Sequence, residues 1–280
     1  MLELRRLALL HQFSLRGTIA AVADATGYSA SAVSQQLAVL EREVGVTLLE
    51  RSARSAHLTS AGRRLAAHAA TVLNAVEAAE ADLASDTVSG RLVISTIPSA
   101  ATAWSPLLVG LRQTHPALEL VLRHLGPARA LDALRSREVD IAIVDDWRPQ
   151  PPEERDLHRH HLVDDPLLMI GDPTDGLWLC APPDQPSRAA TDSALTAAGI
   201  TPVTRWEFEG LSTIADLVAA GTGAALLPAL AMSHRDLPTT SLKPPRHRRI
   251  DALTRTGSAR LPGVVAVLAV LRAEGRALAR

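Results

Sequence analysis

The sequence predicts an all-α N-terminal region with a small two-stranded wing, then one long helix, and finally an α/β region of two subdomains. Three observations lead to this prediction. Apolar residues recur at helical spacing through the first 83 residues. Two interleaved seven-residue apolar repeats run along residues 58–83, the pattern of a helix that forms a coiled-coil seam. Beyond residue 90, short apolar runs alternate with helical segments, which indicates parallel strands covered by helices.

The composition is that of a folded chain without a membrane span. Hydrophobic residues make up 47% and charged residues 21% of the 280 residues, enough to bury a sizeable core. The longest nearly apolar run, 217–232, is too short and too interrupted to cross a bilayer. The N-terminus lacks the features of a signal peptide, and Cys180 is the single cysteine. We therefore expect a cytosolic protein without an intramolecular disulfide, a metal ion or a cofactor.

The first three predicted helices form a helix-turn-helix pattern. The first ends near Gly17, Thr18 can cap the second, and Ser29 or Ser31 can cap the third after a turn at Gly27. Small or hydrogen-bonding side chains lie on the outer face of the third helix, namely Ala30, Ser31, Ser34 and Gln35. Such a face can enter the major groove and reach base edges, although an ordinary solvated face has the same composition.

The wing carries a local basic patch in a chain whose net charge is only −1. Residues 46–49 and 56–58 predict two short strands, with Arg51 and Arg54 at the tip between them. Residues 51–64 contain four arginines and no acid, so we expect this segment to contact phosphates.

The long helix is predicted to begin at Thr59 and to pair with the same helix of another chain. No second helix with such repeats lies nearby in the sequence, so the apolar stripe needs a partner from outside. The expected seam residues are Leu65, Val72, Val76 and Leu83. Because the repeats are rich in alanine and glycine, packing of this helix against its own domain is the alternative.

The order and spacing of the N-terminal residues resemble the LysR-type transcriptional regulators. The resemblance runs without a gap through about sixty residues, in the segments Gly17–Ala23, Tyr28–Leu37, Leu40-Glu41, Val44–Val46, Leu49–Arg51 and Leu58–Gly62. It implies a winged helix-turn-helix DNA-binding domain over 1–58, a linker and dimerisation helix with a hinge over 59–90, and a dimer or tetramer. Gln35 stands where the family commonly has arginine, so the family's base preference does not carry over.

The DNA contacts expected from this reading divide into two kinds. Ser31, Ser34 and Gln35 should touch base edges, with Ser29 and Ala30 beside them at the start of the helix. Thr18, Arg51 and Arg54 should contact phosphates or the minor groove. The partner is then operator DNA in double-stranded form.

The remainder of the chain predicts two α/β blocks. Strands at 91–97, 118–123 and 139–144, with helices at 103–113 and 129–136, form the first block, to which a strand at 250–254 and a helix at 264–271 return. The segments Arg137–Ile143 and Leu217–Pro228 resemble the LysR-type effector domain, which has the periplasmic-binding-protein architecture. The resemblance implies an effector-binding domain over 91–280, with subdomain I at 91–161 and 250–280 and subdomain II at 166–245. A shorter segment than usual at 164–177 predicts a trimmed lip of the cleft between them.

Strand ends and helix starts supply the candidate contacts to a small-molecule effector. Ser99 and Ala100 follow the first strand, where a hydroxyl and free backbone N–H groups can hold a carboxylate. Acids at strand ends favour a zwitterion or amine, such as an amino acid, unless they are simply solvated loop acids. The full candidate set is Ser99, Ala100, Gly126, Pro127, Asp145, Glu209, Gly221 and Thr222.

Other constellations carry less weight. His158, His160 and His161 beside Asp164 and Asp165 could bind a metal, but strand alternation separates the histidines and a solvated strand end is favoured. The run 246–249 follows two prolines and is predicted to be an exposed connection. No nucleophile elbow, dinucleotide fingerprint or phosphate loop is present, so we expect no enzyme.

The predicted function is a DNA-binding transcriptional regulator that senses a small molecule in its C-terminal domain. Two alternatives stay open. A two-lobed α/β binding protein or enzyme would not need the winged helix or the heptads. A nucleoid-type DNA binder would not need the cleft.

Overall fold

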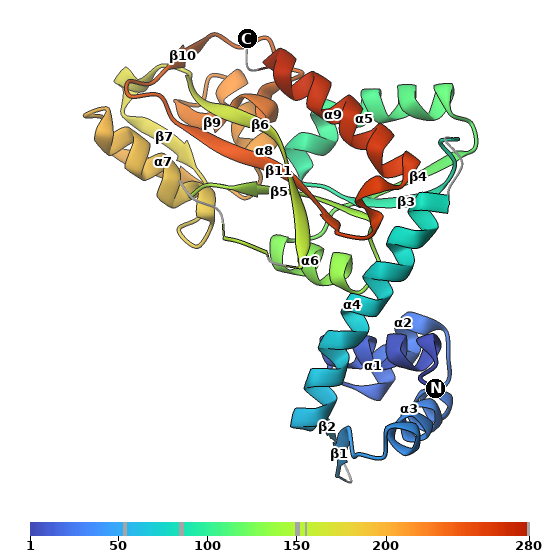
Figure 1. Ribbon diagram of the computed structural model, residues 1–280. Helices are drawn as coiled ribbons and strands as arrows, with labels where there is room; N and C mark the ends of the chain where they lie inside the picture. Colours follow the sequence, from blue (N-terminus) through green and yellow to red (C-terminus); the bar gives the residue numbers. More distant parts are fainter. Residues whose placement is uncertain (53–54, 84–86, 149–151, 155, 279–280) are drawn as a thin grey trace.

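The chain forms a small helical head, one long helix and a larger α/β region (Figure 1). This computed structural model describes residues 1–280 except 53–54, 84–86, 149–151, 155 and 279–280. Arg54, one of the predicted DNA contacts, lies outside the described residues.

The head comprises three helices and a two-stranded wing, and its helix starts confirm the capping predictions. The Thr18 hydroxyl accepts a hydrogen bond from the Ala21 N–H at 3.1 Å, and the Ser29 hydroxyl accepts one from Ala32 at 3.1 Å. Gly27 has φ +72, the left-handed conformation that the turn between the second and third helices requires. The elements are α1 (Leu4–Arg16), α2 (Ile19–Thr26), α3 (Ala30–Val44), β1 (Leu49–Arg51) and β2 (Ala56–Leu58).

The long helix α4 (Ser60–Leu83) packs on the head with one face and leaves the other uncovered. Gly62 touches the wing so closely that a Cβ there would lie 2.2 Å from the Leu48 carbonyl oxygen. Ala69 is fully buried. The first part of the seven-residue repeat that contains Gly62 and Ala69 therefore packs against the head of its own chain, as the alternative to pairing between chains predicted. Val72 and Leu83, by contrast, are 41% and 87% exposed.

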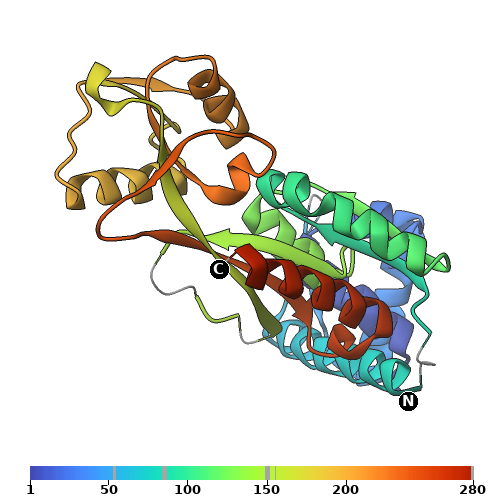
Figure 2. The same ribbon diagram turned by 90° about the horizontal axis from the view of Figure 1, so that it is seen from above.

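The main sheet of the α/β region has the strand order β10-β6-β11-β5-β3-β4, in which β10 is Thr239–Ser241, and β9 (Ala225–Pro228) pairs with β6. The strands β3, β4 and β5 are parallel, as predicted. Helices α5 and α9 pack on one face of these strands and α6 on the other (Figures 1 and 2). The bounds are β3 (Gly90–Ser95), α5 (Pro98–Thr114), β4 (Leu118–Arg123), α6 (Pro127–Arg135), β5 (Ile141–Asp146), β6 (Leu157–Ile170), β11 (His247–Arg255) and α9 (Pro262–Leu278).

The second subdomain is built around a parallel strand pair and two helices. Its elements are β7 (Leu177–Cys180), α7 (Pro186–Ala197), β8 (Thr204–Glu207), α8 (Leu211–Ala219), β9 (Ala225–Pro228) and β10 (Thr239–Ser241), and short 3-10 turns lie at Pro173–Asp175, Ala229–Met232 and Ser258–Arg260. In the described part of the chain, no helix is both long and apolar enough to cross a bilayer.

The two crossings between the subdomains are one continuous antiparallel strand pair, β6 with β11, which runs from one subdomain into the other (Figure 2). The sequence predicted a solvated strand end at 158–161 and an exposed connection at 246–249. His158, His161, Arg246 and His247 are indeed exposed, whereas His160 and Arg248 are buried in long strands, where the predictions are wrong. β6 is 14 residues long, and Arg248 in β11 is only 1% exposed. The charged residues in these two segments made them look solvent-exposed in the sequence. The acids that neutralise Arg248 lie far from it in the sequence, so its burial could not be predicted.

A buried histidine joins β6 to its neighbours. His160 is 6% exposed, its Nε2 lies 3.0 Å from the Thr254 hydroxyl, and Arg272 donates to its Nδ1 at 2.9 Å. Burial, together with the charges of His158 and Arg272, lowers the pKa of His160 from 6.5 to about 4. The folded protein therefore holds this ring neutral.

We predict that His160 makes the fold acid-sensitive. Because its pKa is lower in the folded than in the unfolded chain, its contribution is present above pH 6.5 and is lost as the pH falls towards 4. Urea denaturation should show a loss on the order of 3 kcal/mol from this group across that window. The variant His160→Gln should lack this part of the pH slope, and His68→Gln, at an exposed site, should keep it. Equal slopes for His160→Gln and the unaltered chain would contradict the prediction.

Candidate DNA-reading face and effector site

The outer face of α3 carries the predicted base-reading side chains. Ser31 and Gln35 are exposed and Ser34 is half-buried, whereas the opposite face of the helix fills the core of the head. Ser29 and Ala30 are exposed at the start of the helix, where the hydroxyls of Ser29 and Ser31 lie 2.9 Å apart. The structure thus brings together hydrogen-bonding groups that can reach base edges.

The wing is fastened to this helix by Glu41, a residue whose role the sequence analysis missed. Its Oε1 accepts hydrogen bonds from the backbone N–H groups of Leu48 at 2.8 Å and Leu49 at 2.9 Å. Its Oε2 lies 3.4 Å from Arg51 Nη2, and Arg51 Nη1 lies 3.4 Å from the Ser34 hydroxyl. Arg51 therefore lies in β1 beside the recognition helix rather than at the wing tip. Glu41 is part of the Leu40-Glu41 pair that resembles the LysR-type regulators, and this match was the one feature of the sequence that could have indicated its role.

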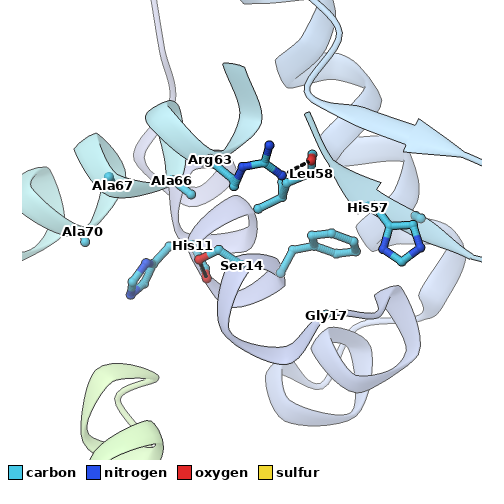
Figure 3. Close-up of a pocket in the computed structure, with 11 residues that line it drawn as sticks. His11, Ser14, Gly17, His57, Leu58, Arg63, Ala66, Ala67 and Ala70 are labelled. Carbon is cyan, nitrogen blue, oxygen red and sulfur yellow. Dashed lines mark hydrogen bonds between the residues drawn. The ribbon is translucent and has the colours of Figure 1, made fainter. Parts of the chain in front are cut away.

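A pocket of about 450 Å³ lies between α1, the wing and α4 (Figure 3). Alanines of α4 form one wall, His11 and Ser14 of α1 another, and His57 closes the wing side. Arg63 borders it and donates to the Leu58 carbonyl at 2.8 Å. Of the predicted DNA and effector residues that the structure describes, none lines this pocket.

The candidate effector residues Ser99 and Asp145 meet at a buried arginine. Arg248 Nη2 donates to the Ser99 hydroxyl at 2.7 Å, and Nη1 donates to Asp145 Oδ2 at 3.1 Å. Arg248 Nε also donates to Asp165 Oδ2 at 2.9 Å. Ser99 and Ala100 lie in the first turn of α5 and are buried, because the helix begins at Pro98 rather than near residue 103 as predicted. Neither Arg248 nor Asp165 was among the predicted site residues.

The charges of this cluster are compensated inside the protein. Burial raises the pKa of the Asp165 carboxyl, against the opposing effects of Arg248 and of the Leu230 N–H, which donates to it at 3.0 Å. Asp145 also accepts a hydrogen bond from Trp147 Nε1 at 2.9 Å, and the Arg248 guanidinium lies 5.3 Å from the centre of the Trp147 ring. The acid expected to attract a ligand amine is therefore already paired with the protein's own cation.

The other candidate effector residues are distributed along the domain. Gly126 and Pro127 are exposed at the start of α6. Glu209 precedes α8, whereas Gly221 and Thr222 follow it. Because a helix of nine residues is about 13 Å long, one ligand of amino-acid size cannot contact both ends of α8. Glu209 and the pair Gly221-Thr222 therefore lie at opposite ends of α8, and their contact with an effector stays a prediction.

The histidine group is divided as strand alternation predicts. The rings of His158 and His160 lie 4.4 Å apart, whereas His161 Nδ1 lies 3.1 Å from Asp251 Oδ1. Among the described residues, no group of three or more His, Cys, Asp or Glu is placed to hold a metal ion.

Comparisons with known proteins agree with this architecture. Residues 4–63 match the family described as "Bacterial regulatory helix-turn-helix protein, lysR family", and residues 85–276 match "LysR substrate binding domain". The DNA-binding transcriptional dual regulator OxyR of Escherichia coli (strain K12) is 32% identical over 262 residues, which cover 84% of each chain. The transcriptional dual regulator GltC of Bacillus subtilis (strain 168) is 27% identical over 245 residues, which cover 81% of each chain.

Solved structures show the same fold. A variant of full-length OxyR from Pseudomonas aeruginosa superposes with a TM-score of 0.70 at 21% identity, over 97% of this chain and 95% of that chain. CbnR, a LysR family transcriptional regulator, gives a TM-score of 0.51 at 19% identity, over 97% of this chain and 100% of that chain.

We predict that Arg248 is indispensable for the stability of the α/β region. Replacing it by methionine leaves Asp145 and the buried Asp165 without their cation, which should cost about 3–5 kcal/mol of the free energy of unfolding. Urea denaturation measures this loss. The triple variant with Asp145→Asn and Asp165→Asn should recover part of it.

The matched control is Arg91→Met, because Arg91 and Glu119 form an ion pair in which both side chains are more than half exposed. It should change stability by about 0–1 kcal/mol. Equal losses for Arg248→Met and Arg91→Met would contradict the account of the buried cluster.

Proposed function

This chain belongs to the LysR family of bacterial transcriptional regulators, and from that premise we propose which residues read its operator, sense its effector and join its copies. Regulators of this family bind operator DNA and small-molecule effectors and form oligomers. The proposal of a regulator, rather than an enzyme or a nucleoid-type DNA binder, rests on the family. We place its action in the cytoplasm, because that is where its DNA is.

The single observation that carries the DNA assignment is the exposed polar face of α3 with Arg51 held beside it. Ser31, Ser34 and Gln35 read base edges, and Thr18 and Arg51 contact phosphates, together with Arg54. Arg51 lies 3.4 Å from the Ser34 hydroxyl, so the proposed base and phosphate contacts are neighbours. Two heads of an oligomer read two half-sites about one helical turn apart, or a multiple of it.

The first test measures operator recognition. Genome-wide DNA pull-down would supply the operator, and Gln35→Ala should then lose on the order of 1–3 kcal/mol of discrimination at one base position. Arg51→Ala should instead weaken binding to every sequence and reduce the salt slope by about one unit. An unchanged sequence preference for Gln35→Ala would show that recognition lies elsewhere.

The uncovered face of α4 supports the assignment of the chain-to-chain seam. Val72 and Leu83 are exposed and Val76 is half-buried, although all three are apolar, whereas the half-buried Leu65 also packs against the core of its own head. An apolar stripe on one side of a helix whose other side is already packed is stabilised by a partner helix.

The seam predicts a change of mass. The double variant Val72→Glu with Val76→Glu places like charges opposite one another across the interface, so sedimentation should give a smaller species. Thr71→Glu changes an exposed neighbour outside the stripe and should leave the mass unaltered. An unaltered mass for the double variant would refute the seam.

The effector site lies at Ser99 and Arg248, and its geometry modifies the amino-acid hypothesis. The Ser99 hydroxyl and the first N–H groups of α5 can donate to a carboxylate, whereas the Arg248 guanidinium is already paired with Asp145 and Asp165. Asp145 is paired with Arg248 and does not require a ligand amine. We therefore assign a carboxylate-bearing effector for which an amine is dispensable.

A thermal-shift panel tests this assignment. Simple carboxylates should stabilise the protein as well as the corresponding amino acids do, by about 2.7 kcal/mol at a hundred times the dissociation constant. Ser99→Ala should abolish the shift, whereas Thr102→Ala, one turn further along α5, should retain it. Stabilisation by amines alone would contradict the assignment.

A further inference from the structure

The turn between α6 and β5, residues 135–138, touches the DNA-binding head directly. Gln12 Nε2 donates to the Ser136 carbonyl at 2.8 Å, and His11 Nε2 lies 3.3 Å from the Arg135 carbonyl. Arg16 Nη2 forms an ion pair with Glu138 Oε1 at 2.5 Å. All three head residues belong to α1. We call this set of contacts the head joint.

Residue Arg137 of the same turn also forms hydrogen bonds with side chains of α4. Arg137 Nε donates to Glu77 Oε1 at 2.9 Å, and its Nη2 donates to Asn74 Oδ1 at 3.2 Å. Arg137 has φ +62, the left-handed conformation, and no other non-glycine residue of the described chain has a positive φ. Such a conformation persists only where the surroundings impose it. Here the conformation ends α6, since the Glu138 N–H turns back to donate to the Ala133 carbonyl at 2.8 Å, and it aims the Arg137 side chain at α4.

Residues 139 and 140, which follow this turn, form hydrogen bonds with strands of subdomain I. Arg255 in β11 donates to the Val139 carbonyl at 2.6 Å and to Asp140 Oδ1 at 3.0 Å. Asp140 Oδ2 accepts a hydrogen bond from the Val93 N–H of β3 at 2.9 Å. The head joint therefore connects α1 to the core of the effector domain rather than to a loose surface segment.

The reading face points away from this joint. In Figure 1, α3 and the wing lie at the end of the head remote from the α/β region, and α4 runs from beside the wing up to that region. Docking through α1 consequently leaves α3 accessible and fixes the direction in which it points. Without this joint, α4 would be the head's attachment to the α/β region, through the packing of Ala66 and Ala69 in the core of the head. The head joint adds a second attachment, through α1.

We propose that the head joint sets the spacing between the two half-sites that an oligomer of this protein recognises. This inference rests on the proposed function, in which two heads read two half-sites. Arg16 and Gln12 are then positioning residues: they touch no base, but they determine how far apart and at what angle the two recognition helices lie. The half-site sequence itself depends on α3 and not on the joint.

Selection from a DNA library with two randomised half-sites and a spacer of varied length tests the proposal. The unaltered full-length chain should enrich one spacing. The double variant Gln12→Ala with Arg16→Ala should enrich the same half-site sequence over several spacings, and its affinity for the original spacing should fall about 3- to 10-fold. Glu138→Gln, which weakens the same joint from the other side, should broaden the spacing in the same sense.

Arg129→Ala is the matched control. Arg129 also pairs with Glu138, at 3.0 Å, but it lies on α6 and belongs to the effector domain rather than to the head. It should retain the single spacing. Identical spacing distributions for the double variant and the unaltered chain would overturn the inference about the joint. Failure of the unaltered chain to enrich any half-site would instead overturn the proposed function.

Discussion

Glu77 joins the two halves of this protein. Its carboxylate, on α4, accepts hydrogen bonds from Arg137 and from Arg255, and all three side chains are largely buried. A buried charge is stable only when a partner of opposite charge compensates it. Moving α4 away from the α/β region would separate the Glu77 carboxylate from Arg137 and from the buried Arg255. The close fit of Gly257, where a Cβ would lie 2.2 Å from the Asn74 carbonyl oxygen, reinforces the same junction. The orientation of the head depends on this attachment.

Arg248 joins separate elements within the effector domain, as Glu77 joins α4 to the α/β region. It lies on the strand pair that links the subdomains and connects Ser99 of α5 with the acids at residues 145 and 165. A ligand that binds to Ser99 therefore competes for a hydrogen bond that already holds β11 in place. Such competition couples the binding of a ligand to the geometry of the two crossing strands. A ligand shifts a conformational equilibrium only when it binds the two conformations with different affinity.

Local features were predictable from the sequence, and distant pairings were not. Thr18 and Ser29 cap their helices as expected, because a cap depends on residues three positions away. The strand β6 and the buried state of Arg248 were missed, because Asp165 lies 83 residues from its partner. Arg255 and Glu77 are separated by 178 residues, so no local pattern indicates their contact. The residues of α3 were found through their motif, whereas Glu41 and the head joint required the fold.

The central claim is that the head is held in one orientation relative to the effector domain. A distance measurement between spin labels at Asp24→Cys in α2 and Ala128→Cys in α6, with Cys180→Ser, tests it most directly, in protein diluted with unlabelled chains so that only distances within one chain are observed. Both label sites are exposed and lie outside the joint. The account predicts one narrow distance distribution that broadens when Gln12 and Arg16 are replaced by alanine. A broad distribution in the otherwise unaltered chain would contradict it.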